Sequence, residues 1–267
     1  MSDSGFAVGV FDSGVGGLTV LKQLMVQLPT ASTIYLGDTA RVPYGTKSAD
    51  TVIRYAIACA QLLIERGIQL LVVACNTASA FALDHLKKTL SIPVIGVIEP
   101  GAQAAVAATR NNRIGIIGTA GTIRSEAYQH AILALRPDVE IISRPCPLFV
   151  PLAEEGWIEG DVPNAIAAKY LHDFRNADVD TLVLGCTHYP LLKPVISNVM
   201  GDDVALIDSA ESVSTVAEHV LGTVQLGNDE HRPRHRFLVT DAPKSFRHIS
   251  ERFLGHPIDD VEWVDVA

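Results

Sequence analysis

The chain has 267 residues, 48% of them hydrophobic, and a formal net charge of −9 from 21 basic and 30 acidic residues. This acidic balance, without a lysine or arginine run, argues against nucleic acid or an anionic membrane surface as the partner. No apolar stretch approaches the length of a transmembrane helix, and the residues after Met1 lack the regions of a signal peptide. We therefore expect a cytoplasmic protein whose four cysteines stay reduced.

The first part of the chain alternates short apolar runs with amphipathic stretches, a pattern that predicts parallel strands joined by helices. Strands are expected at 7–11, 33–37, 71–74 and 93–98, and helices after residue 17, over 48–66 and over 76–90. The glycine-rich turn DSGVGG at 12–17 follows the first strand. It lacks the lysine of a P-loop and the spacing of a dinucleotide-binding fingerprint, so a carboxylate site fits it as well as a phosphate site.

The second part repeats this order after a crossing point at 99–101. Strands are expected at 113–117, 139–143, 182–185 and 204–207, and helices from a turn at 118–122 to about residue 135, over 161–175 and from residue 190. A loop is expected at 145–156. The two sets lie about 106 to 111 residues apart, for example at Cys75 and Cys186, and this near-constant offset indicates an internal duplication.

The tail after residue 208 predicts a helix to residue 221, a polar stretch at 227–233, and strands at 237–240 and 261–264 with a helix between them. We expect the tail to return to the first half. The predicted fold is therefore α/β, with two similar, pseudo-symmetric domains of mainly parallel sheets flanked by helices. The first domain comprises residues 1–98 and 208–267, the second is inserted as residues 99–207, and the active site lies at the interface.

Two cysteines, Cys75 and Cys186, stand directly after predicted strands and before residues that can begin a helix. Ligands of open α/β sheets bind at this carboxyl edge, and a helix N-terminus favours a thiolate. The structural alternative is that each cysteine is only a small buried residue. The shared pattern in both halves favours two thiols that face one ligand from opposite sides.

A thiol pair of this kind suits removal of a proton from a carbon next to a carboxylate, and its return on the other face. An unassisted thiol is only a few per cent thiolate at neutral pH, so neighbouring groups must help to transfer the proton. Asp12 and Asp38 end strands of the first half and could serve its thiol, while Glu154 and His188 could serve the thiol of the second half.

Each of these side chains also has a structural explanation. Asp12 could cap the following helix, and Asp38 could fix its own turn. Glu154 could be a solvated loop charge, and His188 a structural histidine. A zinc site made by the two cysteines and His188 is conceivable, but no fourth ligand stands out, so we expect no metal.

Six motifs together resemble those of bacterial glutamate racemases, and they run in order between about residues 6 and 221. They are FDSGVGG at 11–17, GDT at 37–39, PYG at 43–45, ACNTAS at 74–79, PLFVPLAEEG at 147–156 and GCTHYP at 185–190. The resemblance implies an isomerase that interconverts L- and D-glutamate and supplies D-glutamate for peptidoglycan. Cys75 would take the α-proton of D-glutamate, and Cys186 that of L-glutamate. No motif holds a lysine for pyridoxal, consistent with an enzyme that needs no cofactor.

The resemblance also implies a set of residues that hold glutamate, the small-molecule substrate. They are Asp12, Ser13, Asp38, Pro43, Tyr44, Gly45, Asn76, Thr77, Thr119, Thr122, Thr187 and His188. A homodimer is compatible with the family, while nucleic acid and membranes are not expected as partners. Two alternatives stay open: a racemase for aspartate or another amino acid of the superfamily, and a non-catalytic amino-acid-binding regulatory protein that would tolerate loss of the thiols.

Overall fold

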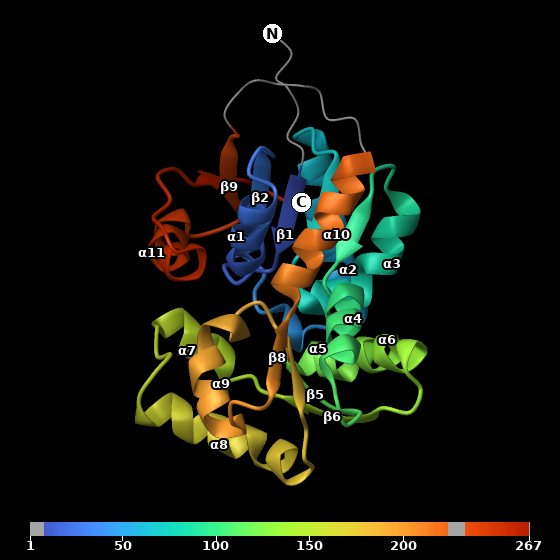
Figure 1. Ribbon diagram of the computed structural model, residues 1–267. Helices are drawn as coiled ribbons and strands as arrows, with labels where there is room; N and C mark the ends of the chain where they lie inside the picture. Colours follow the sequence, from blue (N-terminus) through green and yellow to red (C-terminus); the bar gives the residue numbers. More distant parts are fainter. Residues whose placement is uncertain (1–7, 224–232, 267) are drawn as a thin grey trace.

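The computed structural model describes residues 8–223 and 233–266. These residues form two sheets flanked by helices, one sheet in each half of the molecule (Figure 1). Every strand pair in both sheets is parallel. The α/β class predicted from the alternating pattern is confirmed. Among the described residues, no helix has the length and apolar character needed to span a membrane.

The first sheet has six strands in the order β10-β9-β2-β1-β3-β4. They are β1 (Val8–Asp12), β2 (Thr33–Gly37), β3 (Leu70–Val73), β4 (Val94–Gly96), β9 (His235–Val239) and β10 (Glu262–Trp263). The tail thus adds β9 beside β2 and β10 beside β9, as its expected return to the first half requires. The division of the chain into two domains at residues 98 and 208 stays a prediction.

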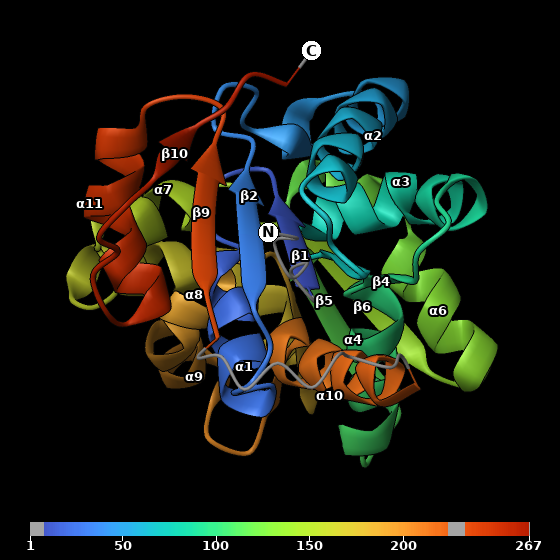
Figure 2. The same ribbon diagram turned by 90° about the horizontal axis from the view of Figure 1, so that it is seen from above.

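Helices cover both faces of this sheet, which Figure 2 shows from above. One face packs against α1 (Leu18–Gln27), α10 (Ser209–Thr223) and α11 (Pro243–Leu254). The other packs against α2 (Ala49–Glu65) and α3 (Asn76–Thr89). Strand side chains alternate between the two cores: Val10 faces the first and Phe11 the second. Burial on both faces explains the nearly continuous apolar runs of these strands.

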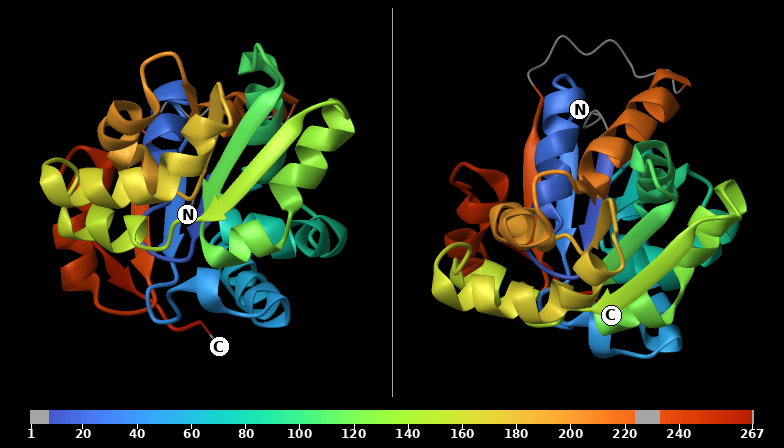
Figure 3. Two further views of the ribbon diagram at one scale, coloured as in Figure 1. Left: turned by 90° about the horizontal axis from the view of Figure 1, so that it is seen from below. Right: turned by 60° about the horizontal axis from the view of Figure 1, so that its bottom comes forward.

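The second sheet has four strands in the order β6-β5-β7-β8, namely β5 (Arg113–Gly118), β6 (Glu140–Pro145), β7 (Thr181–Gly185) and β8 (Ala205–Asp208). One face packs against α4 (Ile98–Ala108) and α6 (Ala127–Leu135), and the other against α7 (Phe149–Glu155), α8 (Asp161–Asn176) and α9 (Lys193–Met200). Figure 3 shows this half from below, with α7 to α9 in yellow to orange on one side and green helices on the other. The shorter elements are α5 (Ala120–Arg124) and the 3-10 turns η1 (Tyr44–Thr46) and η2 (Tyr189–Leu192).

The structure corrects several element boundaries. The loop expected at 145–156 is wrong, because it contains α7, which carries Glu154. Pro151 stands in the first turn of that helix, where its missing N–H has no helical partner to lose. The predicted crossing point at 99–101 lies inside the first turn of α4.

Two further segments differ from expectation. The single helix expected between residue 118 and residue 135 is two helices, α5 and α6, separated by Glu126 in the left-handed region at φ 55°. The helix expected from residue 190 begins as the 3-10 turn η2 and becomes α-helical only at Lys193. Most of the polar stretch at 227–233 lies outside the described residues.

The turns that follow the strands of the two sheets meet closely. A Cβ added at Gly16 would lie 2.3 Å from Thr187 Oγ1, and one added at Gly45 would lie 2.6 Å from Thr119 Cβ. Gly16 and Gly45 belong to the first half, while their neighbours follow strands of the second. The carboxyl edges of both sheets therefore close on one region.

Candidate active site

A cavity of about 60 Å³ lies where the two carboxyl edges meet. It is lined from the first half by Ser13, Gly14, Val42, Pro43, Tyr44, Gly45, Cys75, Asn76 and Thr77, and from the second by Thr119, Val150, Glu154, Cys186, Thr187 and His188. Both predicted thiols thus face the same space. A larger surface hollow of about 710 Å³ beside α11 is open and contains neither cysteine.

Cys75 follows β3 and is the N-cap residue of α3. Its side chain is only 6% exposed, and its thiol donates a hydrogen bond to Ser13 Oγ at 3.5 Å. Burial, and then the charge of Asp12, raise the pKa of Cys75 to about 12, although the hydrogen bond to Ser13 acts in the opposite direction. Cys75 is therefore a neutral thiol at physiological pH.

Cys186 follows β7 and has a different neighbourhood. Its Sγ lies 3.8 Å from His188 Nδ1, and His188 Nε2 lies 3.0 Å from Glu154 Oε1. Burial lowers the pKa of His188, but hydrogen bonds to Cys186 and Glu154 outweigh it and raise that pKa to about 10. The ring is therefore an imidazolium at neutral pH, with one N–H on the sulfur and the other on the carboxylate. These three side chains form a chain of contacts that can pass a proton, and we call it the Cys186 relay.

Asp12 is completely buried at the end of β1 and does not line the cavity. Its carboxylate accepts hydrogen bonds from Gly14 N at 2.9 Å and from Thr187 Oγ1 at 3.4 Å. Burial raises the pKa of Asp12 above its ordinary value, against the opposing charge of His188. Asp12 thus holds the glycine-rich turn and reaches the opposite half through Thr187, and a direct contact with substrate stays a prediction.

Asp38 also lies behind the cavity wall, where both of its carboxylate oxygens are occupied. It accepts hydrogen bonds from Arg41 Nε at 2.8 and 2.9 Å, from Thr240 Oγ1 at 2.9 Å, and from the Tyr44 hydroxyl. Burial, together with the charges of Cys59 and Asp38, raises the pKa of Tyr44. Asp38 therefore holds the neutral Tyr44 phenol in the wall of the cavity. A direct contact of Asp38 with the substrate stays a prediction.

Three threonine hydroxyls join the halves beside the cavity. Thr77 at the start of α3 lies 2.9 Å from Thr119 and 3.0 Å from Thr122, measured between Oγ1 atoms. Thr119 also caps α5 by accepting a hydrogen bond from Thr122 N. Thr77 and Thr119 line the cavity, whereas Thr122 lies behind them.

Sequence reasoning missed Tyr128, which lies on α6 and supports a predicted site residue. Its hydroxyl donates to Asn76 Oδ1 at 2.7 Å and lies 2.8 Å from Ser209 Oγ. Val42 and Val150, which line the cavity, were missed as well. A single tyrosine in an apolar helix is the one signal that could have indicated Tyr128, since a buried phenol needs a hydrogen-bond partner.

The described part of the chain contains no group of three or more His, Cys, Asp or Glu side chains arranged to hold a metal ion. What the cavity does offer is two thiols, an imidazolium with its carboxylate, and several hydroxyl and amide groups. Such a set has the chemistry to take up and deliver protons.

Comparison with known proteins identifies the family. The family of Asp/Glu/hydantoin racemases matches residues 18–216, and the chain belongs to this family. It is therefore an amino-acid racemase, an isomerase. A glutamate racemase from Geobacter metallireducens is 56% identical over 261 residues, which cover 97% of each chain. The resemblance to bacterial glutamate racemases is confirmed.

Solved structures agree with this assignment. A glutamate racemase from Bacillus anthracis superposes with a TM-score of 0.93 at 41% identity, and one from Francisella tularensis in complex with D-glutamate superposes with 0.92 at 40%. Each comparison covers 98% of both chains.

Proposed function

We propose that this chain interconverts L- and D-glutamate without a cofactor, using Cys75 and Cys186 as the two bases. The observation that carries the proposal is that both thiols line one cavity, each at the carboxyl end of a strand from a different sheet. The glutamate specificity rests on the near-full-length relatives named above, one of which was solved with D-glutamate. The D-glutamate formed would supply peptidoglycan synthesis.

The surroundings of the two thiols differ, and the difference supports a separate role for each. Cys75 is a neutral thiol, because burial and Asp12 raise its pKa to about 12. Cys186 Sγ lies 3.8 Å from Nδ1 of the His188 imidazolium, which we propose passes protons to and from the sulfur. This arrangement suits L-glutamate: the Cys186 sulfur takes the α-proton, and the Cys75 S–H bond breaks to give a proton to the opposite face of the same carbon.

The reverse reaction starts from the opposite protonation state. After one turnover Cys186 carries the proton and Cys75 is the thiolate, which can take the α-proton of D-glutamate. His188 and Glu154 can pass a proton between Cys186 and solvent, because the Glu154 side chain is 40% exposed. Two bases fixed on opposite faces are needed, because a cysteine side chain is too short to swing across the substrate.

The polar groups of the cavity wall support binding of an amino acid. The hydroxyls and amides of Ser13, Asn76, Thr77, Thr119 and Thr187 line it, and we propose that they bind the two carboxylates with help from the N-terminus of α3. In this proposal, the cavity wall on the side of the first half is formed by Pro43, Tyr44 and Gly45.

The cavity is small for a ligand-binding site. Pockets for small ligands usually have volumes of roughly 300–1,000 Å³, whereas this one has about 60 Å³. We infer that the cavity wall opens for substrate to enter and then closes, which excludes water from the reacting carbon.

The deciding experiment follows racemisation of L-glutamate by pure, metal-chelated and pyridoxal-free protein. Cys75→Ser and Cys186→Ser should each abolish it, because a serine hydroxyl is a far poorer base. In deuterated water, the product enantiomer should carry deuterium at the α-carbon while early recovered substrate carries little. Substantial racemisation by either serine variant would rule out the paired thiols.

Two controls address the alternatives. L-aspartate in the same assay tests whether the chain is instead an aspartate racemase, which should then turn over aspartate faster than glutamate. Growth of a bacterial strain that requires D-glutamate tests the role in peptidoglycan supply. Binding of amino acids without any racemisation would favour the regulatory alternative.

A further inference from the structure

Helix α11 belongs to the tail, for which the sequence indicates no function, yet it contacts the relay in the opposite half. The Phe253 ring packs edge-on against the His188 ring, with centroids 5.2 Å apart and an interplanar angle of 80°. The preceding residue, Arg252, donates a hydrogen bond from Nη1 to the backbone oxygen of Glu154. Two successive residues of α11 therefore touch the two partners that support Cys186.

The contact with Arg252 satisfies a particular backbone group. At the end of α7, Trp157 N donates to Leu152 O and Gly156 N donates to Ala153 O. Glu154 O has no such partner from the helix, as is usual for the last carbonyls of a helix. The Arg252 guanidinium takes this place, where a cation also interacts favourably with the helix dipole.

Gly156 makes room for this contact. It ends α7 in the left-handed region at φ 78°, and a Cβ there would lie 2.7 Å from Arg252 Cζ. The guanidinium therefore occupies the space that a side chain would fill. Helix α7 has only seven residues, so its position depends on tertiary contacts of this kind rather than on its own helical stability.

We propose that Arg252 and Phe253 are positioning residues that hold the Cys186 relay in place from the opposite half of the molecule. Arg252 fixes the end of α7, and so the point from which the Glu154 side chain reaches His188. Phe253 fixes the plane of the imidazole, so that both ring nitrogens keep their partners. The inference rests on the proposed function, in which Cys186 is one of the two bases.

The test must separate the two thiols. Racemisation alone cannot do so. The equilibrium constant between L- and D-glutamate is one, so kcat/KM must be equal for the L-to-D and D-to-L directions in every variant. Elimination from 3-chloroglutamate needs one base only: a cysteine thiolate takes the α-proton and becomes a thiol, the electrons of the C–H bond form a C=C bond, and chloride leaves. The resulting enamine tautomerises and hydrolyses to 2-oxoglutarate and ammonium, which can be measured. The enantiomer of L configuration at the α-carbon reports on Cys186, and that of D configuration on Cys75.

Arg252→Ala should slow elimination from the L enantiomer by about tenfold, a fraction of what acid–base assistance is typically worth. Elimination from the D enantiomer should stay within about twofold of wild type. Arg252→Lys should restore part of the rate, since an ammonium can still donate to the Glu154 carbonyl. The matched control is Arg247→Ala on the same helix, because Arg247 also donates to a backbone oxygen, that of Asp259, but within its own half.

Two further variants keep the test independent of the fate of Arg252→Ala. Gly156→Ala leaves Arg252 intact but displaces its guanidinium, and Phe253→Leu keeps an apolar side chain but removes the ring beside His188. Each variant should also slow elimination from the L enantiomer while leaving elimination from the D enantiomer close to the wild-type rate. The proposal is overturned if the variants slow elimination from both enantiomers equally, or slow elimination from neither. If wild type neither racemises glutamate nor eliminates chloride, the proposed function itself fails.

Discussion

His188 combines burial with a positive charge. The ring is 6% exposed, and its pKa of about 10 lies above the ordinary value of 6.5 because Cys186 and Glu154 outweigh the effect of burial. A group whose pKa is raised on folding stabilises the fold fully below its unfolded pKa, and this contribution is lost as pH rises through the folded pKa. The stabilisation from His188 should therefore be complete below about pH 6.5 and disappear towards pH 10.

The first prediction follows from the direction in which the pKa of His188 is shifted. The melting temperature of wild type should exceed that of His188→Asn at pH 6, and the difference should shrink steadily as pH approaches 10. Differential scanning calorimetry across this range measures it, with His130→Asn as a control because His130 is an exposed histidine on α6. A constant difference between the two proteins would show that the imidazole is not charged in the fold.

The second prediction concerns turnover. Glu154→Gln keeps an oxygen near His188 but removes the negative charge, and His188→Asn removes the acid beside Cys186. Each should lower kcat by roughly 10²- to 10⁴-fold, the usual range for acid–base assistance.

The variant Asp12→Asn should also lower kcat, because the Asp12 carboxylate accepts a hydrogen bond from Thr187. Turnover within about twofold of wild type would assign the residue concerned to structure alone.

At the scale of elements, the site depends on turns that touch across the two halves. A Cβ at Gly45 would lie 2.6 Å from Thr119 Cβ and 2.8 Å from its Oγ1. As a third prediction, Gly45→Ala should push the loop after β2 away from α5 and raise KM for glutamate several-fold in a racemisation assay.

The control for Gly45→Ala is Gly222→Ala near the end of α10, where an added Cβ has no neighbour within 4 Å. That change should leave KM unaltered and stabilise the protein by about 0.4–1 kcal/mol. If both alanine variants bind glutamate equally well, close approach at Gly45 is not needed for substrate binding.

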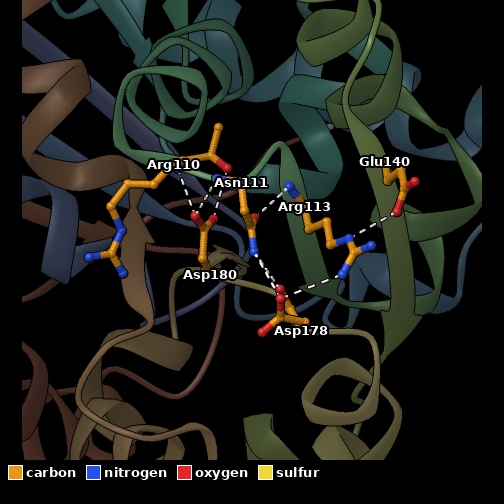
Figure 4. A network of polar contacts seen from close by, with 7 residues as sticks. Arg110, Asn111, Arg113, Glu140, Asp178 and Asp180 are labelled. Atoms are coloured by element: carbon orange, nitrogen blue, oxygen red, sulfur yellow. Dashed lines mark hydrogen bonds and ion pairs between the residues drawn. The ribbon is translucent and has the colours of Figure 1, made fainter.

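A network of polar contacts lies at the amino end of β7, away from the cavity (Figure 4). We call the hydrogen bonds that Asp180 accepts there the polar clasp. Asp180, just before β7, accepts hydrogen bonds from Arg110 N at 2.6 Å, Asn111 N at 2.9 Å and Thr109 Oγ1 at 2.8 Å. Burial raises the pKa of Asp180, but these bonds outweigh it and lower that pKa below its ordinary value of 3.8. The clasp ties the start of β7 to the turn between α4 and β5.

The fourth prediction uses this clasp. A carboxyl group whose pKa is lowered on folding stabilises the fold above its unfolded pKa, and the contribution is lost as pH falls through the folded pKa. Asp180→Asn should therefore lower the melting temperature at pH 7, and the difference from wild type should fade below about pH 4. Racemisation should be unchanged, because the clasp lies at the opposite end of β7 from Cys186.

The control for this prediction is Asp178→Asn, whose side chain is 81% exposed and lies 3.5 Å from Arg113. Exposed ion pairs contribute little to stability, so this variant should melt close to wild type. Equal melting temperatures for Asp180→Asn and wild type at pH 7 would contradict a stabilising clasp.

At the scale of the whole molecule, the tail completes the first sheet. Strand β9 pairs with β2 over five residues, from Thr33 opposite His235 to Gly37 opposite Val239. Strand β10 then pairs with β9. Without them, β2 would present an unpaired and apolar edge, which is prone to aggregation.

The fifth prediction is that a chain ending at residue 208 aggregates, whereas the full chain folds and stays in solution. Solubility, circular dichroism and size-exclusion chromatography would measure this. A soluble, folded product would mean that the tail is dispensable, and the assignment of 208–267 to the first domain would then need revision.

The sequence alone determined the strands, the main helices and the position of both thiols. These follow from apolar runs, capping residues and short-range spacing, which are local properties of the chain. Cys75 and Cys186 each stand one or two residues past the end of a strand, so the sheet edge on which they lie is already set by the direction of parallel strands. The motifs around them were sufficient to indicate the family.

Tertiary structure decided which groups assist the thiols. Asp38 turns to Arg41 and Tyr44, Tyr128 supports Asn76 from the other half, and Arg252 reaches Glu154 across 98 residues of chain. No local pattern encodes such contacts, because they exist only where the returning tail and the facing sheet bring distant residues together. The helix that carries Glu154 was missed for a related reason: its seven residues contain a proline, and packing against neighbours, rather than helix propensity, stabilises it.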